Sequence, residues 1–444
     1  MDIPFLSDGF RGSAPYIDAH RGKTFVIYVE GDAFKDVACD RLVQDIALLH
    51  TLGVRLVLVF GCRAQARQAL FDAGRTRRLH AGRWVVDSED MALIAEQAQR
   101  LRLLIEAHFS MGLPNTPLHG LDIATVSGNF VMARPFGIHD GIDTLYAGDV
   151  RHIRHDAIRT LLDQNAITLI SPIGYSSTGE LFDLEATEVA EHVAIALQAD
   201  KLIMLGRDTG LTDTNGHLLR QMMPEAAEAV VTHPEQQRYL KAACAAARRG
   251  VDRTHLLSWV DKDALLAELF TRDGVGTMIT QQTYEVLRGA GSEDIGGLLA
   301  LLRPLEARQI LVPRTRERLE QQIDDYVVIV RDGMTIGCAA LHTFENATIG
   351  ELACVAVHDD YRRGKRGSRL LEAIENKAVE QGVDALFILT THTSHWFVEH
   401  GFVPADVEVL PMQRRATYNP QRNSKIMVKS LKRLAASISL VKGH

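Results

Sequence analysis

The chain has 444 residues, of which 46% are hydrophobic and 24% are charged, which is the composition of an ordinary soluble globular protein. A chain of this length is expected to form about two or three domains, each with ample hydrophobic core. Its net charge of −7 argues against sequence-independent nucleic-acid binding, because such binding needs a broad basic face.

Apolar strand patterns alternate with helical patterns through residues 24–260. Continuous apolar strands that are separated by helices predict a mostly parallel sheet covered on both faces, which is an α/β fold. The expected strands are Thr24–Val29, Val54–Phe60, Ile123–Ser127, Ile167–Ser171 and Lys201–Leu205, and the expected helices are Asp36–Leu52, Ser88–Phe109, Ala186–Gln198 and Pro234–Arg249.

The pattern changes near Tyr284–Glu293, and we place a domain boundary at about residue 285. Asp332–Gly333 is a credible hairpin turn between two of the later strands. The expected elements are a helix at Glu293–Arg308, strands at Tyr326–Arg331, Thr335–His342, Leu352–Val357 and Ala385–Thr390, a helix that opens at Ser368, and a helix at Ser394–His400.

The five cysteines are odd in number, and no pair of them has metal-ligand spacing. The histidines do not cluster like ligands either, so we expect no metal site. No apolar run is long enough to span a membrane, and no secretory signal pattern opens the chain. These features indicate a cytoplasmic protein with neither a membrane nor a nucleic acid as partner.

A basic, glycine-bearing loop joins the strand Leu352–Val357 to the following helix. Backbone N–H groups of such a loop converge on one phosphate, helped by the helix dipole. The alternative interpretation is a solvated basic turn. The stretch resembles motif A of the GNAT acetyltransferases, which holds the pyrophosphate of acetyl-CoA, although Lys365 stands where the motif has its first glycine. The resemblance implies acetyl-CoA contacts from the loop and strand residues Cys354, Val355, Val357, Arg362, Arg363, Lys365, Arg366, Gly367 and Ser368.

The segment Thr390–Phe402 resembles a later element of the same family, where two splayed strands admit the pantetheine arm. The aromatic pair Trp396 and Phe397 would pack under that arm, or could simply be core residues.

Acetyl transfer to an amine needs a base for the amine and a proton donor for the departing thiolate. Glu351 opens the motif strand, where GNAT enzymes often carry an acidic base, and it is the first candidate. The candidate proton donors are Tyr418 and a hydroxyl among Thr390, Thr391, Thr393 and Ser394. Thr390 and Tyr418 are favoured, and the sequence does not separate them. The backbone N–H of Cys354 or Val355 would polarise the thioester carbonyl.

Two arginine-bearing segments flank this domain and suggest an acidic acceptor. Guanidinium groups bind carboxylates through paired hydrogen bonds, and an acidic amino acid carries two carboxylates. The predicted acceptor-binding residues are Arg314, Arg316, Cys354, Arg422 and Ser424.

Over residues 9–430 the chain resembles the bacterial N-acetylglutamate synthases, notably at His20–Phe25, Val126–Phe130, Phe270–Thr277 and Arg303–Glu306. The resemblance implies an amino-acid-kinase-like three-layer αβα sandwich joined to a GNAT α+β domain. It implies synthesis of N-acetyl-L-glutamate from acetyl-CoA and L-glutamate, the first step of arginine biosynthesis, often with inhibition by L-arginine. The implied division is an N-terminal segment 1–20, a kinase-like domain 21–284, a GNAT domain 285–436 and a tail 437–444.

The kinase-like domain is expected to transfer no phosphoryl group. Tyr28 and Glu30 stand where the family's first loop has a lysine and a glycine, and Cys62 and Arg63 replace two glycines of the second. Thr187 occupies the place of a catalytic aspartate. Lost lysines and added carboxylates make a poor polyphosphate site.

The segment 267–278, near the end of this domain, resembles the arginine-binding segment of arginine-sensitive acetylglutamate kinases. Glu268 would pair with the guanidinium, while Gly274, Gly276 and Thr277 would offer backbone groups. Alternatively, the segment is only a glycine-rich connection. Domains of this kind commonly dimerise, so a homo-oligomer is expected.

Other functions remain open at this point. The acceptor could be another amino acid or a protein amine, or both halves could bind ligands without catalysis, as in an amino-acid sensor. Acetylglutamate kinase activity is disfavoured by the replaced residues of the kinase-like half.

Overall fold

The computed structural model describes residues 3–36, 38–76, 78–111, 116, 118–230, 232–281, 285–331, 333–362, 365–391 and 393–431. Two compact units divide the chain, Met1–Gln282 and Thr283–His444. Of the residues singled out in the sequence, Asp332, Arg363 and the tail 437–444 lie outside the described residues. The four-part division implied by the sequence stays a prediction.

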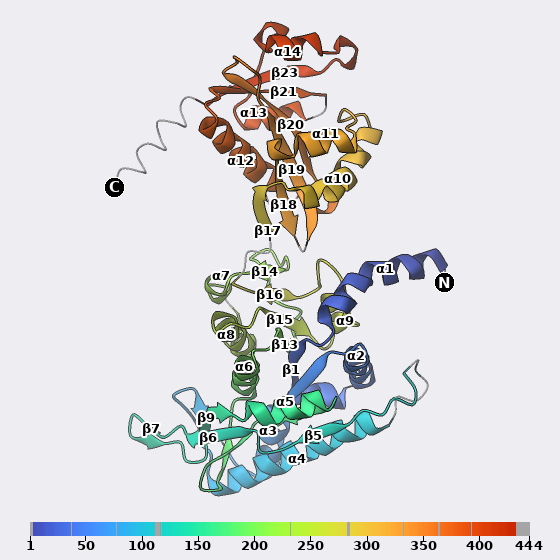
Figure 1. The fold of residues 1–444 in the computed structure, drawn as a ribbon. Helices are drawn as coiled ribbons and strands as arrows, with labels where there is room; N and C mark the ends of the chain where they lie inside the picture. The colour runs from blue at the N-terminus through green and yellow to red at the C-terminus, as the bar shows by residue number, and fades with distance from the viewer. Residues whose placement is uncertain are drawn as a thin grey trace. The chain divides into compact units, whose positions relative to one another are not determined.

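An eight-stranded sheet forms the centre of the first unit (Figure 1). Every neighbouring pair of strands is parallel except β15 and β16, so the predicted mostly parallel sheet is confirmed. The spatial order is β14 (Gln221–Met222), β16 (Thr277–Ile279), β15 (Arg253–Ser258), β13 (Lys201–Gly206), β1 (Thr24–Glu30), β2 (Arg55–Gly61), β10 (Ile167–Ile170) and β5 (Thr125–Ser127).

Helices cover both faces of this sheet, as the continuous apolar strands predict. Successive residues of β1 point to opposite faces, so Phe25 and Ile27 join one buried cluster while Val26 and Tyr28 join the other. The first cluster includes α2 (Cys39–Thr51), α3 (Arg63–Asp72), α4 (Ser88–Ser110) and α9 (Ala264–Phe270), and the second includes α5 (His155–Asp163), α6 (Ala186–Leu197) and α8 (Pro234–Arg248).

Smaller elements complete the first unit. The helix α1 (Ile3–His20) contacts α9, where the imidazole Nε2 of His20 lies 2.8 Å from the carbonyl oxygen of Leu269. The remaining elements are a four-stranded sheet of β12 (Leu181–Asp183), β11 (Ile173–Tyr175), β6 (Val131–Pro135) and β9 (Gly148–Ile153), the hairpins β3 (Leu79–His80) with β4 (Arg83–Trp84) and β7 (Ile138–His139) with β8 (Ile142–Asp143), and α7 (Pro224–Glu228).

The second unit is a seven-stranded sheet with helices on both faces. All neighbouring strands are antiparallel except β20 and β21. The order is β17 (Glu285–Gly289), β18 (Tyr326–Arg331), β19 (Met334–His342), β20 (Ile349–Val357), β21 (Ala385–Thr390), β23 (Lys425–Ser430) and β22 (Val403–Pro404). Helices α12 (Arg366–Glu380) and α13 (Ser394–Glu399) pack on one face, α10 (Ile295–Ala307) and α11 (Arg316–Gln321) pack on the other, and α14 (Met412–Ala416) precedes β23.

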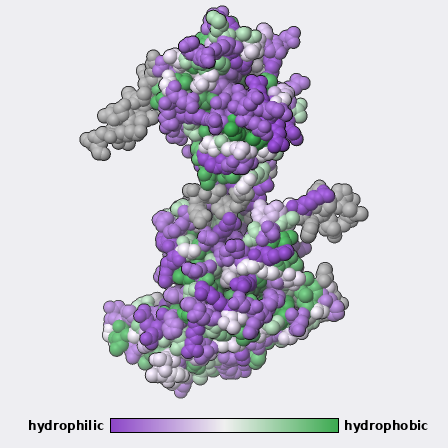
Figure 2. All heavy atoms as spheres, viewed as in Figure 1, coloured by the Kyte–Doolittle hydropathy of each residue, from purple (hydrophilic) through white to green (hydrophobic). Residues whose placement is uncertain are grey.

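Figure 2 shows that hydrophobic residues on the viewed face lie in small scattered groups among hydrophilic ones. Within the part of the chain that the structure describes, no helix combines the length and the apolar character needed to cross a membrane.

Candidate active site

The strands β20 and β21 separate in the middle of the second sheet. Their parallel pairing covers only Ile349–Glu351 against Ala385–Phe387. Beyond it, β20 continues to Val357 and β21 continues to Thr390, paired only with their outer neighbours. The gap leaves backbone N–H and C=O groups of two strand edges facing each other, so an extended amide-bearing chain could pair between them.

A β-bulge lies on β20 at the start of this gap. On β19, Cys338 faces Ala356 and Ala340 faces Ala353, so β20 carries one residue more than its partner. Cys354 takes up the extra residue with φ of +53°, a left-handed conformation that costs a non-glycine residue about 1–2 kcal/mol. Such backbone strain is found at functional sites. The bulge turns backbone groups of Cys354 and Val355, the two predicted carbonyl-polarising residues, out of the regular ladder.

The predicted anion-binding loop leads into the first turn of α12. Lys365 precedes this helix with φ of +59°, the left-handed conformation that suits the glycine of the family motif. The backbone N–H groups of Arg366, Gly367 and Ser368 follow in the first turn, where an α-helix has no internal acceptors for them. A side chain on Gly367 would meet Trp396 at 3.1 Å, so glycine allows Trp396 to approach this turn.

Several side chains of the loop have protein partners. Arg366 pairs with Glu285 and donates to the carbonyl oxygen of Tyr361 at 3.0 Å. Arg362 pairs with Asp359 at 2.5 Å, and the Ser368 hydroxyl lies 2.9 Å from Nε2 of His400. In this arrangement Arg366 would serve an anion mainly through its backbone N–H.

The predicted base, Glu351, is buried and paired with an arginine that the sequence did not single out. Both of its carboxylate oxygens accept from Arg414 of α14, at 2.7 Å from Nε and 3.1 Å from Nη2. This two-point pair holds the carboxylate in one orientation. Each oxygen keeps a second lone pair, so Glu351 can still accept a proton.

The two candidate proton donors lie near the same end of β21. The Thr390 hydroxyl lies 3.4 Å from that of Thr393, and Thr390 faces Lys425 across the β21–β23 ladder. The Tyr418 hydroxyl donates to the carbonyl oxygen of Ser424, the residue before Lys425, at 3.4 Å. The structure therefore does not separate Thr390 from Tyr418.

The predicted acceptor-binding arginines differ in their surroundings. Burial tends to lower the pKa of Arg314, but the nearby Cys354, Tyr326, Glu351 and Glu306 outweigh it and raise that pKa. Arg314 is half-buried, and its guanidinium donates to the carbonyl oxygen of Val312 at 2.9 Å. Arg316 is exposed and pairs with Glu320 at 2.9 Å. The Arg422 guanidinium donates to the carbonyl oxygen of Gln309 at 3.0 Å.

A histidine that the sequence analysis missed faces the predicted base. His342 lies directly opposite Glu351 in the antiparallel β19–β20 ladder, so both side chains are on one face. Its Nδ1 lies 2.7 Å from Oδ2 of Asp325, a contact that favours a proton on Nδ1 and leaves Nε2 as an acceptor. In the sequence, His342 only ends a strand pattern, and nothing there indicates that it lies beside the predicted base.

Comparison with known proteins identifies the family. Residues 23–258 match the amino acid kinase family and residues 322–404 match the acetyltransferase (GNAT) domain. The chain is 46% identical over 434 residues to the amino-acid acetyltransferase of Proteus mirabilis (strain HI4320). This match covers 96% of the present chain and 98% of that protein. The chain belongs to the amino-acid acetyltransferase family.

Two solved structures of N-acetylglutamate synthase from Neisseria gonorrhoeae are similar to this amino-acid acetyltransferase over 96% of its chain and 99% of theirs. The complex with coenzyme A and L-arginine is 37% identical with a TM-score of 0.86, and the complex with coenzyme A and N-acetyl-glutamate is 38% identical with a TM-score of 0.61. The predicted pairing of a kinase-like with a GNAT domain is confirmed, as is the class of enzyme, an amino-acid N-acetyltransferase that uses acetyl-CoA. No group of three or more His, Cys, Asp or Glu side chains among the described residues could hold a metal ion.

The predicted effector segment of the acetyltransferase is a compact loop after α9. The Glu268 carboxylate is buried, accepts from the N–H groups of Val275 at 2.7 Å and Gly276 at 2.9 Å, and lies 2.7 Å from Nδ1 of His255. Burial opposes its ionisation, but these hydrogen bonds outweigh burial and lower the Glu268 pKa to about 2. Glu268 therefore remains ionised at neutral pH, with both oxygens already engaged.

The other residues of this segment also contribute to the loop itself. A side chain on Gly274 would meet the Glu268 carboxylate at 2.2 Å, and the Thr277 hydroxyl accepts from the N–H of Leu211 at 2.8 Å. Arg220 donates to the carbonyl oxygens of Asp273, at 3.1 Å, and Gly274. The loop thus already binds one guanidinium through its carbonyl groups, and its binding of an effector stays a prediction.

Proposed function

We propose that the protein is an N-acetylglutamate synthase, which transfers the acetyl group of acetyl-CoA to the α-amine of L-glutamate. The observation that most supports the proposal is the opening between β20 and β21, with the Cys354 bulge and the Glu351 carboxylate at its edge and Arg314 close by. The solved relatives bind coenzyme A with N-acetyl-glutamate or L-arginine, which supports the same acceptor here.

The proposed reaction assigns one task to each group. Glu351 takes a proton from the glutamate ammonium, directly or through water, so that the amine can attack the thioester carbonyl. A backbone N–H at the bulge, of Cys354 or Val355, stabilises the negative charge that develops on the carbonyl oxygen. Loss of one such donor typically costs about 10²–10³-fold in turnover. Thr390 or Tyr418 returns a proton to the departing thiolate.

The acceptor would be recognised through its two carboxylates. Arg314 is the stronger candidate, because it is half-buried and the Glu351 charge acts on it, whereas Arg316 is exposed and paired on α11. Arg422 and Ser424 would contribute from the turn before β23, and Cys354 would contribute from the bulge. Arg422 would have to exchange its contact with the Gln309 carbonyl for a substrate carboxylate.

We further propose that this reaction is the first step of arginine biosynthesis, that L-arginine inhibits it by binding at the Glu268 loop, and that the protein is a homo-oligomer. Backbone N–H groups of the loop hold the Glu268 carboxylate, and its carbonyls already receive the Arg220 guanidinium. Inhibition would require L-arginine to bind one arrangement of the protein more tightly than another.

An acceptor panel tests the proposal. Thiol release from acetyl-CoA would be measured with L-glutamate, L-glutamine, L-aspartate, L-lysine and a short peptide. We expect the highest kcat/KM with L-glutamate and a clear loss with L-glutamine, which lacks the second carboxylate. A preference for L-lysine or the peptide would contradict the assignment of glutamate while leaving acetyl transfer intact.

A further inference from the structure

A cavity of about 500 Å³ lies in the first unit, and none of the residues proposed for acetyl transfer lines it. It opens at the carboxyl ends of the parallel strands β1, β2 and β13, where Glu30, Gly61 and Arg207 end or follow these strands. Ligands of open α/β sheets bind at this edge. The volume is in the range of small-molecule sites.

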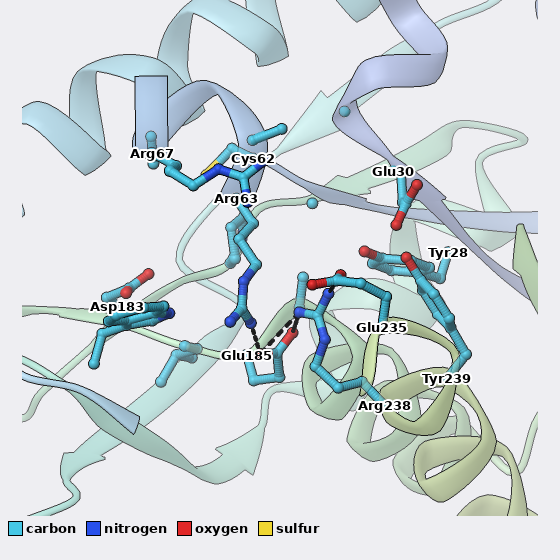
Figure 3. Close-up of a pocket in the computed structure, with 18 of the residues that line it drawn as sticks. Tyr28, Glu30, Cys62, Arg63, Arg67, Asp183, Glu185, Glu235, Arg238 and Tyr239 are labelled. Atoms are coloured by element: carbon cyan, nitrogen blue, oxygen red, sulfur yellow. Dashed lines mark hydrogen bonds and ion pairs between the residues drawn. The ribbon is translucent and has the colours of Figure 1, made fainter. Parts of the chain in front are cut away.

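The inner wall of the cavity gathers three acceptor groups. Figure 3 shows the carboxylate of Glu30 and the hydroxyls of Tyr28 and Tyr239 directed toward one another. The two tyrosine rings lie 5.6 Å apart. The Tyr239 side chain is 5% exposed, and its hydroxyl has no hydrogen-bond partner among the residues that the structure describes. A buried hydroxyl without a partner is costly, so this arrangement points to a ligand.

The negative charge of the Glu30 carboxylate is also poorly compensated by neighbouring groups. Its Oε2 accepts one long hydrogen bond from the indole of Trp259, at 3.4 Å. Burial raises the Glu30 pKa, and the nearby carboxylates of Asp32 and Glu235 raise it further, while Trp259 and Arg238 oppose the shift. A cation beside Glu30 would relieve both the burial and the repulsion.

Three of the five arginines that line the cavity are paired with protein carboxylates. Glu185 holds Arg63 at 2.8 Å and Arg238 at 3.1 Å, and Arg238 also pairs with Glu235 (Figure 3). Arg83 pairs with Asp149 at 3.1 Å and with Glu188. Arg67 and Arg207 have no carboxylate partner among the described residues, but both are exposed, and Arg207 lies over the Trp259 ring at 5.2 Å. The inner wall, in contrast, is acidic and aromatic.

We propose that this cavity binds a small molecule bearing a primary ammonium group, with the ammonium between Glu30, Tyr28 and Tyr239. A primary ammonium carries three N–H donors and no acceptor, which matches one carboxylate and two hydroxyl oxygens. The binding site is independent of the proposed acetyl transfer, since none of its residues is assigned to that reaction.

Calorimetric titration of the full chain with n-butylamine tests the proposal. Three other compounds are titrated in the same way. n-Butanol has a similar shape but no charge, and tetramethylammonium has the charge but no N–H donors. ADP tests whether the cavity binds a polyphosphate instead. We expect saturable binding of n-butylamine alone. The affinity should decrease when the pH is lowered, because protonated Glu30 no longer attracts the ammonium. Absence of saturable n-butylamine binding, or equal binding of n-butanol, would overturn the proposal, and so would binding of ADP in its place.

Two variants and two controls locate the site. Glu30→Gln keeps an acceptor for Trp259 but removes the charge, and should weaken n-butylamine binding about tenfold or more. Tyr239→Phe removes only the hydroxyl and should also weaken binding, which keeps the test decisive if Glu30→Gln fails to fold. Tyr175→Phe, on β11, and Glu96→Gln, at an exposed position on α4, should bind like the wild type. Wild-type affinity in both Glu30→Gln and Tyr239→Phe would place the ammonium elsewhere.

Discussion

Glu351 and Arg414 form a buried two-point ion pair in the proposed acetyltransferase site, and the pair explains how a base can be held in place there. A carboxylate in a partly closed site would otherwise lose solvation without compensation. The guanidinium keeps the carboxylate oriented and leaves one lone pair on each oxygen for the amine or a bridging water.

Glu351→Gln tests the role of this carboxylate. The amide retains the size of the side chain but cannot accept the ammonium proton, so kcat should decrease by about 10²–10⁴-fold. Steady-state kinetics should show a KM for acetyl-CoA close to that of the wild type. Glu372→Gln, an exposed position on α12, is the matched control and should leave kcat unchanged. Full activity of Glu351→Gln would remove this residue from the mechanism, and His342 would then be the next candidate base.

Lys365 has a strained backbone at the position where the family motif has a glycine. The effect of this strain on stability can be measured separately from the effect of the lysine charge on acetyl-CoA binding. Lys365→Gly should raise the free energy of unfolding by about 1 kcal/mol, because glycine adopts φ of +59° without a Cβ clash. The same change should raise the KM for acetyl-CoA, because a positive charge is lost beside the proposed pyrophosphate site.

Lys365→Ala is the control for this experiment, since it removes the charge and keeps the strain. Urea unfolding should show no comparable stabilisation for Lys365→Ala, whereas both variants should share the higher KM. Equal stability of Lys365→Gly and the wild type would contradict the proposed strain.

At the scale of helices and strands, most of the fold was predictable because the elements are long and strongly patterned. The predicted helix Ser88–Phe109 is α4 (Ser88–Ser110), and the predicted strand Tyr326–Arg331 is β18. The second sheet of the first unit was missed. Its strands β11 and β12 have three residues each, too few for a period to show, and its longer strands β6 and β9 lack a regular alternation of buried and exposed residues.

The bulge on β20 and the ion pairs of the site were not predictable. No glycine marks the left-handed residue Cys354, since the surrounding sequence is an ordinary apolar strand. Arg414 stands 63 residues from Glu351, and Glu285 stands 81 residues from Arg366. Such pairs depend on which strands and helices pack together in the fold, and the local patterns of a single sequence do not show which distant elements become neighbours.

The helix α2 carries a buried acid whose titration should be visible in the stability of the protein. Burial, with a smaller effect from Asp263, raises the pKa of Asp45 from its ordinary value of 3.8 to about 7. An acid that ionises later in the folded than in the unfolded state stabilises the fold below the unfolded pKa. That contribution is lost as the pH rises toward 7.

Asp45→Asn should remove this dependence. Thermal or urea unfolding should show the variant to be more stable than the wild type at pH 8 by about 2 kcal/mol, after allowance for partial solvent screening. At pH 4 the two proteins should differ little. Asp122→Asn, at an exposed position, should show no pH-dependent difference. A destabilised Asp45→Asn at pH 8 would mean that the carboxylate has a partner that compensates its charge.

At the scale of the whole molecule, we propose that one unit binds the effector and the other transfers the acetyl group. The sequence predicted both units from their alternating patterns and from family motifs. The coupling between them could not be predicted, because it depends on energy differences between arrangements of the protein.

The Glu268 loop provides the test of this coupling. L-Arginine should inhibit thiol release by the wild type, and Glu268→Gln should shift its half-maximal concentration upward by about tenfold, within the usual range of such couplings. Each variant is compared as the ratio of its rates with and without L-arginine, which removes differences in turnover. Glu96→Gln, an exposed change in the same unit, should respond like the wild type. An unchanged arginine response in Glu268→Gln would place the effector elsewhere.

The second unit is proposed to acetylate the α-amine of L-glutamate. The most direct measurement is mass spectrometry of the products formed from acetyl-CoA, isotope-labelled in its acetyl group, and L-glutamate by the purified full-length chain. We predict labelled N-acetyl-L-glutamate in an amount equal to the coenzyme A released. Release of coenzyme A without labelled N-acetyl-L-glutamate, or no reaction at all, would contradict the account.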